Sequence, residues 1–142
     1  MREILFKAKT CNGEWVEGLL AHKDNKWYIS NKVGQPFAYE VRPDTICQYT
    51  GLTDKNGNRI WENDVVEFED TGEEGYEYKE GYDFVNRARV EFAEARWSLT
   101  DFIDTNSGVV DEMYNHDEFM DLWQHCEVIG NIFDNADLLK GE

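Results

Sequence analysis

Three cysteines and three histidines are the residues of this 142-residue chain best suited to hold a metal or to act as a nucleophile. The thiols stand at Cys11, Cys47 and Cys126, and no C-x-x-C pair occurs. A structural zinc site needs about four converging ligands, which only long-range folding would bring together here. His125 and Cys126 are neighbours, and neighbouring side chains of a strand point to opposite faces, so we expect no direct dyad. The odd cysteine count favours reduced thiols in a cytoplasm.

A second candidate for chemistry is the segment that begins at Asp54, because its Asp-Lys-Asn-Gly-Asn order resembles the start of a calcium-binding loop. Such a loop requires glycine at its sixth position and glutamate at its twelfth. Counted from Asp54, these positions hold Arg59 and Val65, so the pattern fails twice. We therefore expect a turn in this segment and no bound calcium.

The densest cluster of acids around a histidine lies between residues 111 and 118. A metal-dependent hydrolytic site could be built from such residues, but a solvated acidic loop explains the same composition more simply. The G-x-S-x-G, Walker and G-x-G-x-x-G motifs are absent from the sequence. The sequence therefore predicts no metal, no cofactor and no catalytic residue, and we expect the protein not to be an enzyme.

Net charge is the largest departure from an ordinary composition, since 30 acids oppose 14 bases and give −16 at pH 7. The excess is uneven: residues 67–83 carry −7 and residues 101–142 carry −10. Nucleic acid and anionic membranes repel such a chain. One explanation is a solubilising surface, and the other is a contact surface for a basic protein partner, formed by residues 67–83 and 101–121. The candidate partner-binding residues in the first stretch are Glu69, Asp70, Glu73, Glu74 and Glu77.

A nucleic-acid-associated regulator is the alternative function, because residues 84–100 carry a small net positive charge. Its phosphate contacts would come from Arg87, Arg89 and Arg96. The 5 tryptophans could stack on single-stranded bases, although core packing accounts for them equally well. No apolar run approaches the about 18 residues that predict a membrane span, and the N-terminus has no apolar signal-peptide core. We therefore expect a cytoplasmic location and no membrane partner.

Short runs of β-branched and aromatic residues, separated by turn signals, predict the elements that position these side chains. Residues 69–83 predict a mobile surface loop or ribbon, and residues 117–124 predict one or two helical turns or a buried loop. Asp134 is the expected N-cap of a short C-terminal turn or helix at residues 136–139. Strands are expected near residues 4–9, 15–21, 27–29, 45–50, 65–68, 84–92, 97–102 and 126–133, with Val128, Gly130 and Ile132 on one face of the last.

Residues 48–66, QYTGLTDKNGNRIWENDVV, resemble the segment QYTGLKDKNGKEIYEGDIV that is typical of the YopX family of phage and prophage proteins. The opening at residues 2–8, REILFKA, is similar to the family's REIKFRAW start. The ending at residues 127–139, EVIGNIFDNADLL, is similar to its EVIGNIYENPELL. Asn63 stands where the family has glycine, and because asparagine tolerates a positive φ, the turn can survive.

The resemblance implies a mainly-β fold that mixes β-sandwich and small β-barrel features with one or two short helices. It implies a single domain over residues 1–142, with two lobes at roughly 1–50 and 51–142 as an alternative description. It also implies a phage or prophage origin in a bacterial host, and a homo-oligomer. The family supplies no catalytic residue, since its shared positions set turns or build the core, the core positions being Tyr49, Ile60, Val65, Val128 and Ile132. We therefore expect a non-enzymatic accessory protein that acts by binding another protein.

Overall fold

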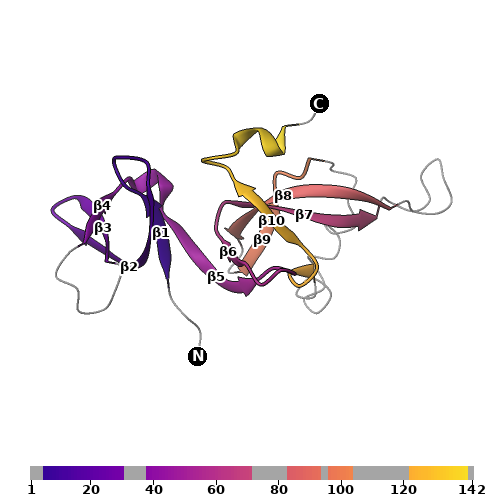
Figure 1. The fold of residues 1–142 in the computed structure, drawn as a ribbon, viewed down its shortest axis with the longest axis horizontal. Coiled ribbons are helices and arrows are strands. Elements are labelled where there is room, and N and C mark those ends of the chain that lie inside the picture. The colour runs from indigo at the N-terminus through magenta and orange to yellow at the C-terminus, as the bar shows by residue number, and fades with distance from the viewer. Residues whose placement is uncertain (1–4, 31–37, 72–82, 94–95, 104–121, 141–142) are drawn as a thin grey trace. The chain divides into compact units, whose positions relative to one another are not determined.

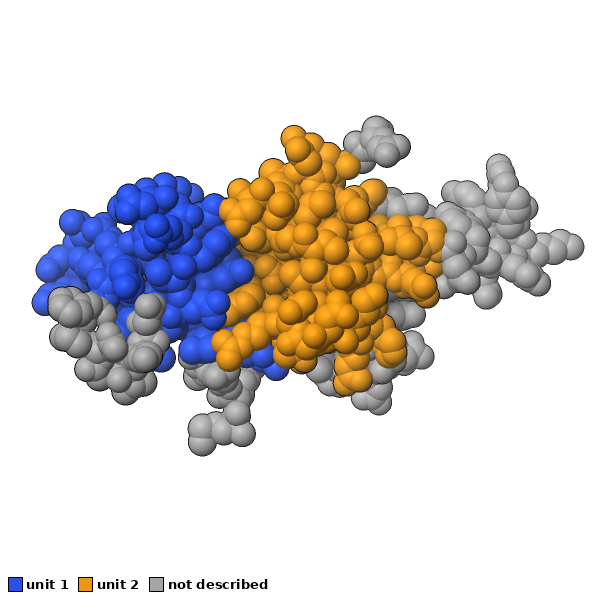
Figure 2. All heavy atoms as spheres, in the orientation of Figure 1, with its two compact units in different colours: residues 1–51 blue, residues 52–142 orange. Residues whose placement is uncertain are grey.

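The structure is a computed structural model that describes residues 5–30, 38–71, 83–93, 96–103 and 122–140 (Figure 1). The chain divides into two compact units, residues 1–51 and residues 52–142 (Figure 2). Strands dominate both units and form two antiparallel sheets, and neither sheet closes into a barrel within the described ranges. The expected mainly-β fold is therefore confirmed.

The first unit is an antiparallel sheet of short strands joined by tight turns. Gly13 takes a φ of 84° in the first turn, as the Asn12-Gly13 pair predicts. Asp24 and Asn25 also have positive φ, a conformation that suits a two-residue hairpin turn. The strand order is β4-β3-β2-β1-β5, with β1 (Phe6–Lys9), β2 (Trp15–Lys23), β3 (Lys26–Ser30), β4 (Tyr39–Val41) and β5 (Cys47–Thr53).

A small apolar cluster holds the first unit together. Its centre is formed by Ala8, Ile29 and Val41, which are almost fully buried. Strand β4 supplies one of these residues and has no counterpart among the predicted strands. The 3-10 turn Pro43–Thr45 precedes β5. Partly buried residues that pack on the cluster are Phe6, Val16, Leu20, Trp27 and Ile46.

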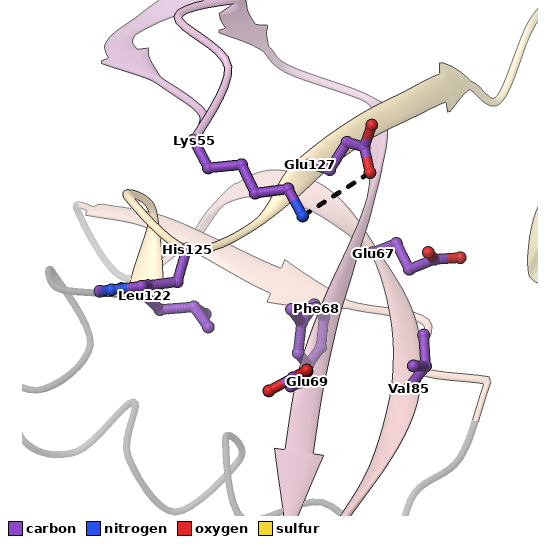
Figure 3. Close-up of a pocket in the computed structure, with 8 residues that line it drawn as sticks. All are labelled: Lys55, Glu67, Phe68, Glu69, Val85, Leu122, His125 and Glu127. Atoms are coloured by element: carbon purple, nitrogen blue, oxygen red, sulfur yellow. Dashed lines mark ion pairs between the residues drawn. The ribbon is translucent and has the colours of Figure 1, made fainter.

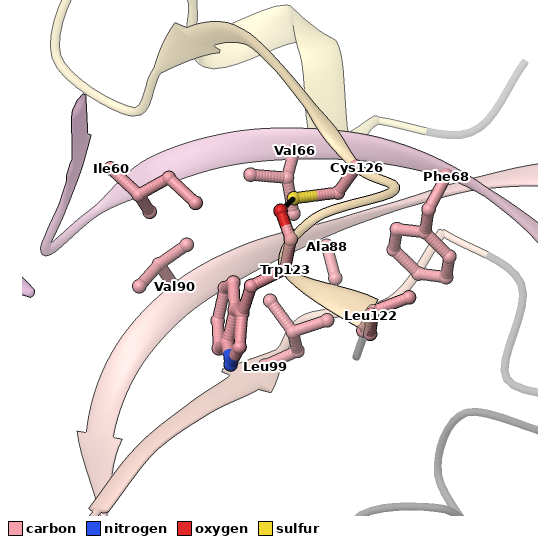
Figure 4. Packing of buried hydrophobic residues seen from close by; sticks show 9 residues of the cluster. All are labelled: Ile60, Val66, Phe68, Ala88, Val90, Leu99, Leu122, Trp123 and Cys126. Atoms are coloured by element: carbon pink, nitrogen blue, oxygen red, sulfur yellow. Dashed lines mark hydrogen bonds between the residues drawn. The ribbon is translucent and has the colours of Figure 1, made fainter. Parts of the chain in front are cut away.

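The second unit is built on a four-stranded sheet in the order β10-β7-β8-β9. Its strands are β7 (Asp64–Thr71), β8 (Asp83–Ala93), β9 (Arg96–Thr100) and β10 (Glu127–Asn131). One face of the sheet carries the main core of the unit (Figure 4). The buried members of that core are Ile60, Val66, Phe68, Ala88, Val90, Leu99, Leu122, Trp123 and Cys126.

The Asn56-Gly57 turn connects β5 to β6 (Arg59–Trp61), the next strand in the sheet order. Gly57 has a φ of 80°, so the predicted turn is confirmed. Asn63 follows in the next turn with a φ of 69°. Asparagine therefore adopts here the conformation expected of the family's glycine.

The surface loop or ribbon predicted for residues 69–83 has strand residues at both ends. Residues 69–71 belong to β7 and residue 83 begins β8. Asp70 is 4% exposed, and its Oδ2 accepts a hydrogen bond of 3.0 Å from Nδ2 of Asn86. The acidic run therefore begins inside the sheet, where alternation buries every second side chain. Residues 72–82 lie outside the described residues.

Strand β10 contains a bulge that changes which face its side chains occupy. Val128 lies opposite Val66 of β7. Gly130, two residues further on, lies opposite Val65, which is only one residue from Val66. Val128 and Gly130 therefore point to opposite faces, and the expectation that they share one is wrong, because a bulge adds an unpaired residue.

A C-terminal 3-10 turn, Ala136–Leu139, approaches Gly130 closely. A Cβ at this glycine would lie 2.5 Å from Oδ1 of Asn135 and 2.7 Å from Cδ1 of Leu138. The N-cap of this turn is Asn135, so the prediction of Asp134 as its N-cap is wrong. The Asn135 side chain makes no hydrogen bond to the backbone of the turn as a cap.

One buried carboxylate ties the turn at residues 54–58 to β10. Oδ1 of Asp54 accepts hydrogen bonds of 2.9 Å from the backbone N–H groups of Asn56 and Asn58. Oδ2 accepts a third, also 2.9 Å, from the N–H of Val128. Burial by itself raises the pKa of Asp54, but these N–H donors stabilise the charged form, so the pKa lies below its usual value. The segment that resembles the start of a calcium-binding loop therefore has a structural role, because Asp54 holds its turn against β10.

We predict that Asp54→Asn lowers the free energy of unfolding at pH 7 by about 2 kcal/mol, since the amide is uncharged and replaces one of the two acceptor oxygens with an NH2 donor. The pKa of Asp54 is lowered by folding, so its contribution is complete above the unfolded pKa of about 3.9 and disappears as pH falls through the folded value. Urea unfolding at pH 7 and at pH 3 measures the difference. The exposed Asp137→Asn is the matched control, and a deficit in Asp54→Asn that is equal at both pH values would contradict the prediction.

Candidate functional site

A groove of about 270 Å³ lies beside β7 in the second unit (Figure 3). The ladder between β10 and β7 begins with Glu127 opposite Glu67, and β7 continues past this pair to Thr71. The groove is found where that ladder starts. Its lining residues are Lys55, Glu67, Phe68, Glu69, Val85, Leu122, His125 and Glu127.

Three carboxylates from two strands line this groove. Glu67 and Glu69 are two residues apart on β7 and therefore lie on the same face, and Glu127 lies opposite Glu67. Oε2 of Glu67 is 3.0 Å from Nε of Arg87, and Oε2 of Glu127 is 3.9 Å from Nζ of Lys55. Glu69 is exposed and forms no ion pair with any described residue. Among the described residues, Glu69 is therefore the groove carboxylate without an ion pair.

Apolar side chains supply the rest of the lining. Phe68 and Leu122 are 3% and 8% exposed and belong to the core of the unit. Val85 lies opposite Glu69 on β8 and is 62% exposed. Val85 is therefore the exposed apolar residue of the lining, because alternation along β7 points Phe68 away from the face of Glu67 and Glu69. Among the residues that the structure describes, no three histidine, cysteine or acidic side chains are grouped to hold a metal.

The structure places two of the predicted acidic residues, Glu69 and Asp70, in different surroundings. Glu69 lies in the groove, whereas Asp70 is buried against Asn86 and is out of reach of a partner. The remaining predicted contacts, Glu73, Glu74 and Glu77, lie outside the described residues. Sequence reasoning missed the other groove residues, because the segments around positions 55, 68, 85 and 125 meet only in the folded sheet.

The predicted basic strand is paired with acids. Arg87 contacts Glu67 as described above. Nε of Arg89 is 2.8 Å from Oδ2 of Asp101, and its Nη2 is 3.6 Å from Oε2 of Glu91. Arg96 begins β9 and is partly buried. Arg87 and Arg89 therefore do not offer the uncompensated positive charge that phosphate binding requires.

The three thiols differ in exposure. Cys11 is exposed, whereas Cys47 and Cys126 are buried. Burial first, and then the negative charge of Asp54, raises the pKa of Cys126 to about 12. Its Sγ lies 3.4 Å from the carbonyl oxygen of Trp123, to which the thiol donates. His125 is exposed while Cys126 is fully buried, so the two side chains do not act as a dyad.

The sequence matches the model of the YopX protein family over residues 7–140. The chain belongs to the YopX family. The structure of this YopX-family protein is similar to the crystal structure of protein EF1440 from Enterococcus faecalis, with a TM-score of 0.52 and 21% identity over 99% of this chain and 100% of the other. At this identity the likeness shows the fold alone. No curated protein matches the chain.

The parts of this YopX-family chain that the structure describes include no helix with both the length and the apolar character needed to cross a membrane.

We predict that a maleimide labels one thiol per native chain, at Cys11, because a thiolate is the reacting form and the other two thiols are buried. Denaturant should raise the labelling to all 3 cysteines of the chain. Mass spectrometry counts the adducts, and Cys11→Ser is the control that should abolish native labelling. Rapid native labelling of Cys126 would contradict the buried site described here.

Proposed function

We propose that this YopX-family protein is a non-enzymatic binding module of phage or prophage origin. It binds a basic segment of another protein through the acidic surface of its C-terminal unit. The observation that carries the proposal is the division of charge between the two units. Residues 1–51 contain seven bases and six acids, whereas residues 52–142 contain seven bases and 24 acids, a net charge of −17.

Two features of the second unit support a basic partner. Arg87 and Arg89, which stand at the centre of its sheet, are already paired with acids, so the surplus negative charge is left for solvent and partners. Glu69 is an exposed carboxylate that makes no ion pair with a described residue, and Val85, which lies opposite it, is 62% exposed. A field of one sign speeds association with an oppositely charged protein and fixes its orientation more than it adds affinity.

Repulsion argues against the alternative partners. A unit with this charge is repelled by the phosphates of nucleic acid and by anionic lipid headgroups. Self-association would bring two such units together against the same repulsion. Light scattering in about 50 mM and 500 mM salt tests whether the homo-oligomer expected from the sequence forms when this repulsion is strong and when it is screened.

We predict that a protein captured from a bacterial host lysate is lost when the acidic surface is neutralised by Glu69→Gln, Glu73→Gln, Glu74→Gln and Glu77→Gln. Capture should also fall as salt increases, because surface charges are screened within about 10 Å at 0.1 M salt. The matched control changes four exposed acids of the first unit, Glu14→Gln, Asp24→Asn, Glu40→Gln and Asp44→Asn. A partner that both variants retain, or that both lose, would remove the acidic-surface proposal.

We predict no gel shift with single-stranded or double-stranded DNA at about 50 mM salt, where phosphate contacts are strongest. The paired arginines and the net charge of −16 are the reason. A shift that disappears in Arg87→Gln and Arg89→Gln would instead support a nucleic-acid-associated regulator.

A further inference from the structure

We propose that Asn12 is a site of spontaneous deamidation, and that Asn56, in a second turn of the same geometry, is protected from it. The modification is independent of the proposed function. In this reaction the backbone nitrogen of the following residue attacks Cγ of the asparagine and expels ammonia, and water then opens the cyclic imide to aspartate or isoaspartate. Glycine hinders the attack least, because it has no side chain. The sequence contains two Asn-Gly pairs, at residues 12–13 and 56–57.

The backbone hydrogen bonds of the two turns correspond to each other. The N–H of Gly13 donates to the carbonyl of Thr10 at 2.9 Å, and the N–H of Gly57 donates to the carbonyl of Asp54 at 3.0 Å. A second bond runs from the N–H of each acceptor residue to the carbonyl four residues on, at 2.9 Å in both turns. The φ values of the two glycines are 84° and 80°, and both asparagines are exposed. Solvent access and local backbone geometry therefore do not distinguish the two sites.

Each turn has to open before the reaction can proceed, because a hydrogen bond within the turn holds the attacking glycine nitrogen. The rate therefore depends on local opening, whose free energy differs between parts of one structure. Opening of residues 54–58 breaks the bonds that two N–H groups of this turn donate to the carboxylate of Asp54. That carboxylate is anchored by the N–H of Val128, and the N–H of Lys55 donates to the carbonyl of Cys126. Hydrogen bonds to a charged acceptor are the stronger kind.

The first turn does not have this support. Thr10 occupies the position of Asp54, and its buried Oγ1 makes no hydrogen bond within the described part of the chain. Residues 11–13 are tied to another element by Nη2 of the exposed Arg42, which donates to the carbonyl of Cys11 at 2.9 Å. The turn of Asn12 therefore opens more readily, and we expect Asn12 to deamidate about tenfold faster than Asn56, or more.

Deamidation of Asn12 changes both the charge and the main chain of the first unit. It adds one negative charge to residues 1–51, which hold seven bases and six acids, and so removes their net positive charge. The isoaspartate product also lengthens the main chain by one carbon atom in the turn between β1 and β2. The pair of Lys9 and Trp15, which lies next to this turn, is then the part of the ladder that the change disturbs first.

The test incubates the full chain at mildly alkaline pH, with and without urea, and follows the two Asn-Gly peptides by mass spectrometry. In the native chain, the peptide that contains Asn12 should gain the mass of an amide-to-acid conversion about tenfold faster than that of Asn56, or more. In urea the two rates should be similar, because neither turn is then folded. Native rates that are equal, or faster conversion of Asn56, would overturn the proposal.

Exchange of the residue that begins each turn tests the cause of the difference. Thr10→Asp places a carboxylate where Asp54 stands in the other turn, and it should slow Asn12 while the rate at Asn56 stays the same. Asp54→Ala should raise the rate at Asn56 alone. If Asp54→Ala raises both rates, the variant is unfolded and Thr10→Asp decides. An unchanged rate at Asn12 in Thr10→Asp would show that the carboxylate does not protect such a turn, and the inference would fail.

Discussion

The buried carboxylate of Asp54 is the contact on which the geometry of the second unit depends. Its bond to the N–H of Val128 joins segments that are 74 residues apart in the chain. The backbone N–H of Lys55 donates a second cross-link to the carbonyl of Cys126, at 3.0 Å. Lys55 and Glu127 are the chain neighbours of Asp54 and Val128, so the same lock sets the ion pair at the rim of the groove. The turn at residues 54–58 thereby helps to position Lys55 and Glu127, two of the residues that line the groove.

Charge in this protein is organised at two levels. Within the sheet of the second unit, acids and arginines are matched across strands, as in the pair of Glu67 and Arg87, which lie directly opposite each other. Opposite charges at such positions stabilise a sheet modestly. The second level is the surplus of carboxylates, since the second unit has a net charge of −17. Glu69 belongs to both levels, because it lies on a strand of the sheet and makes no ion pair with a described residue.

Sequence reasoning found the strands because alternation of apolar and polar residues is a local property. It missed β4 and β6, which have only three residues each. It took the acidic run from Glu69 as a surface loop or ribbon, because charge density hid the alternation that buries Asp70. Glu69 could be predicted as a contact residue from charge alone. The rest of the groove could not, since its walls meet through the pairing of β7 with β10, a long-range contact that no single segment of the sequence specifies.

The bulge in β10 divides the strand into two parts, whose side chains alternate between the faces of the sheet in opposite order. Up to Val128, residues follow one assignment of inward and outward positions, and from Gly130 onward the assignment is reversed. A comparison of relatives that assumes a regular strand would therefore place Gly130 on the face of Val128, which it does not share. Tolerance to substitution along residues 127–131 should therefore follow the bulged register.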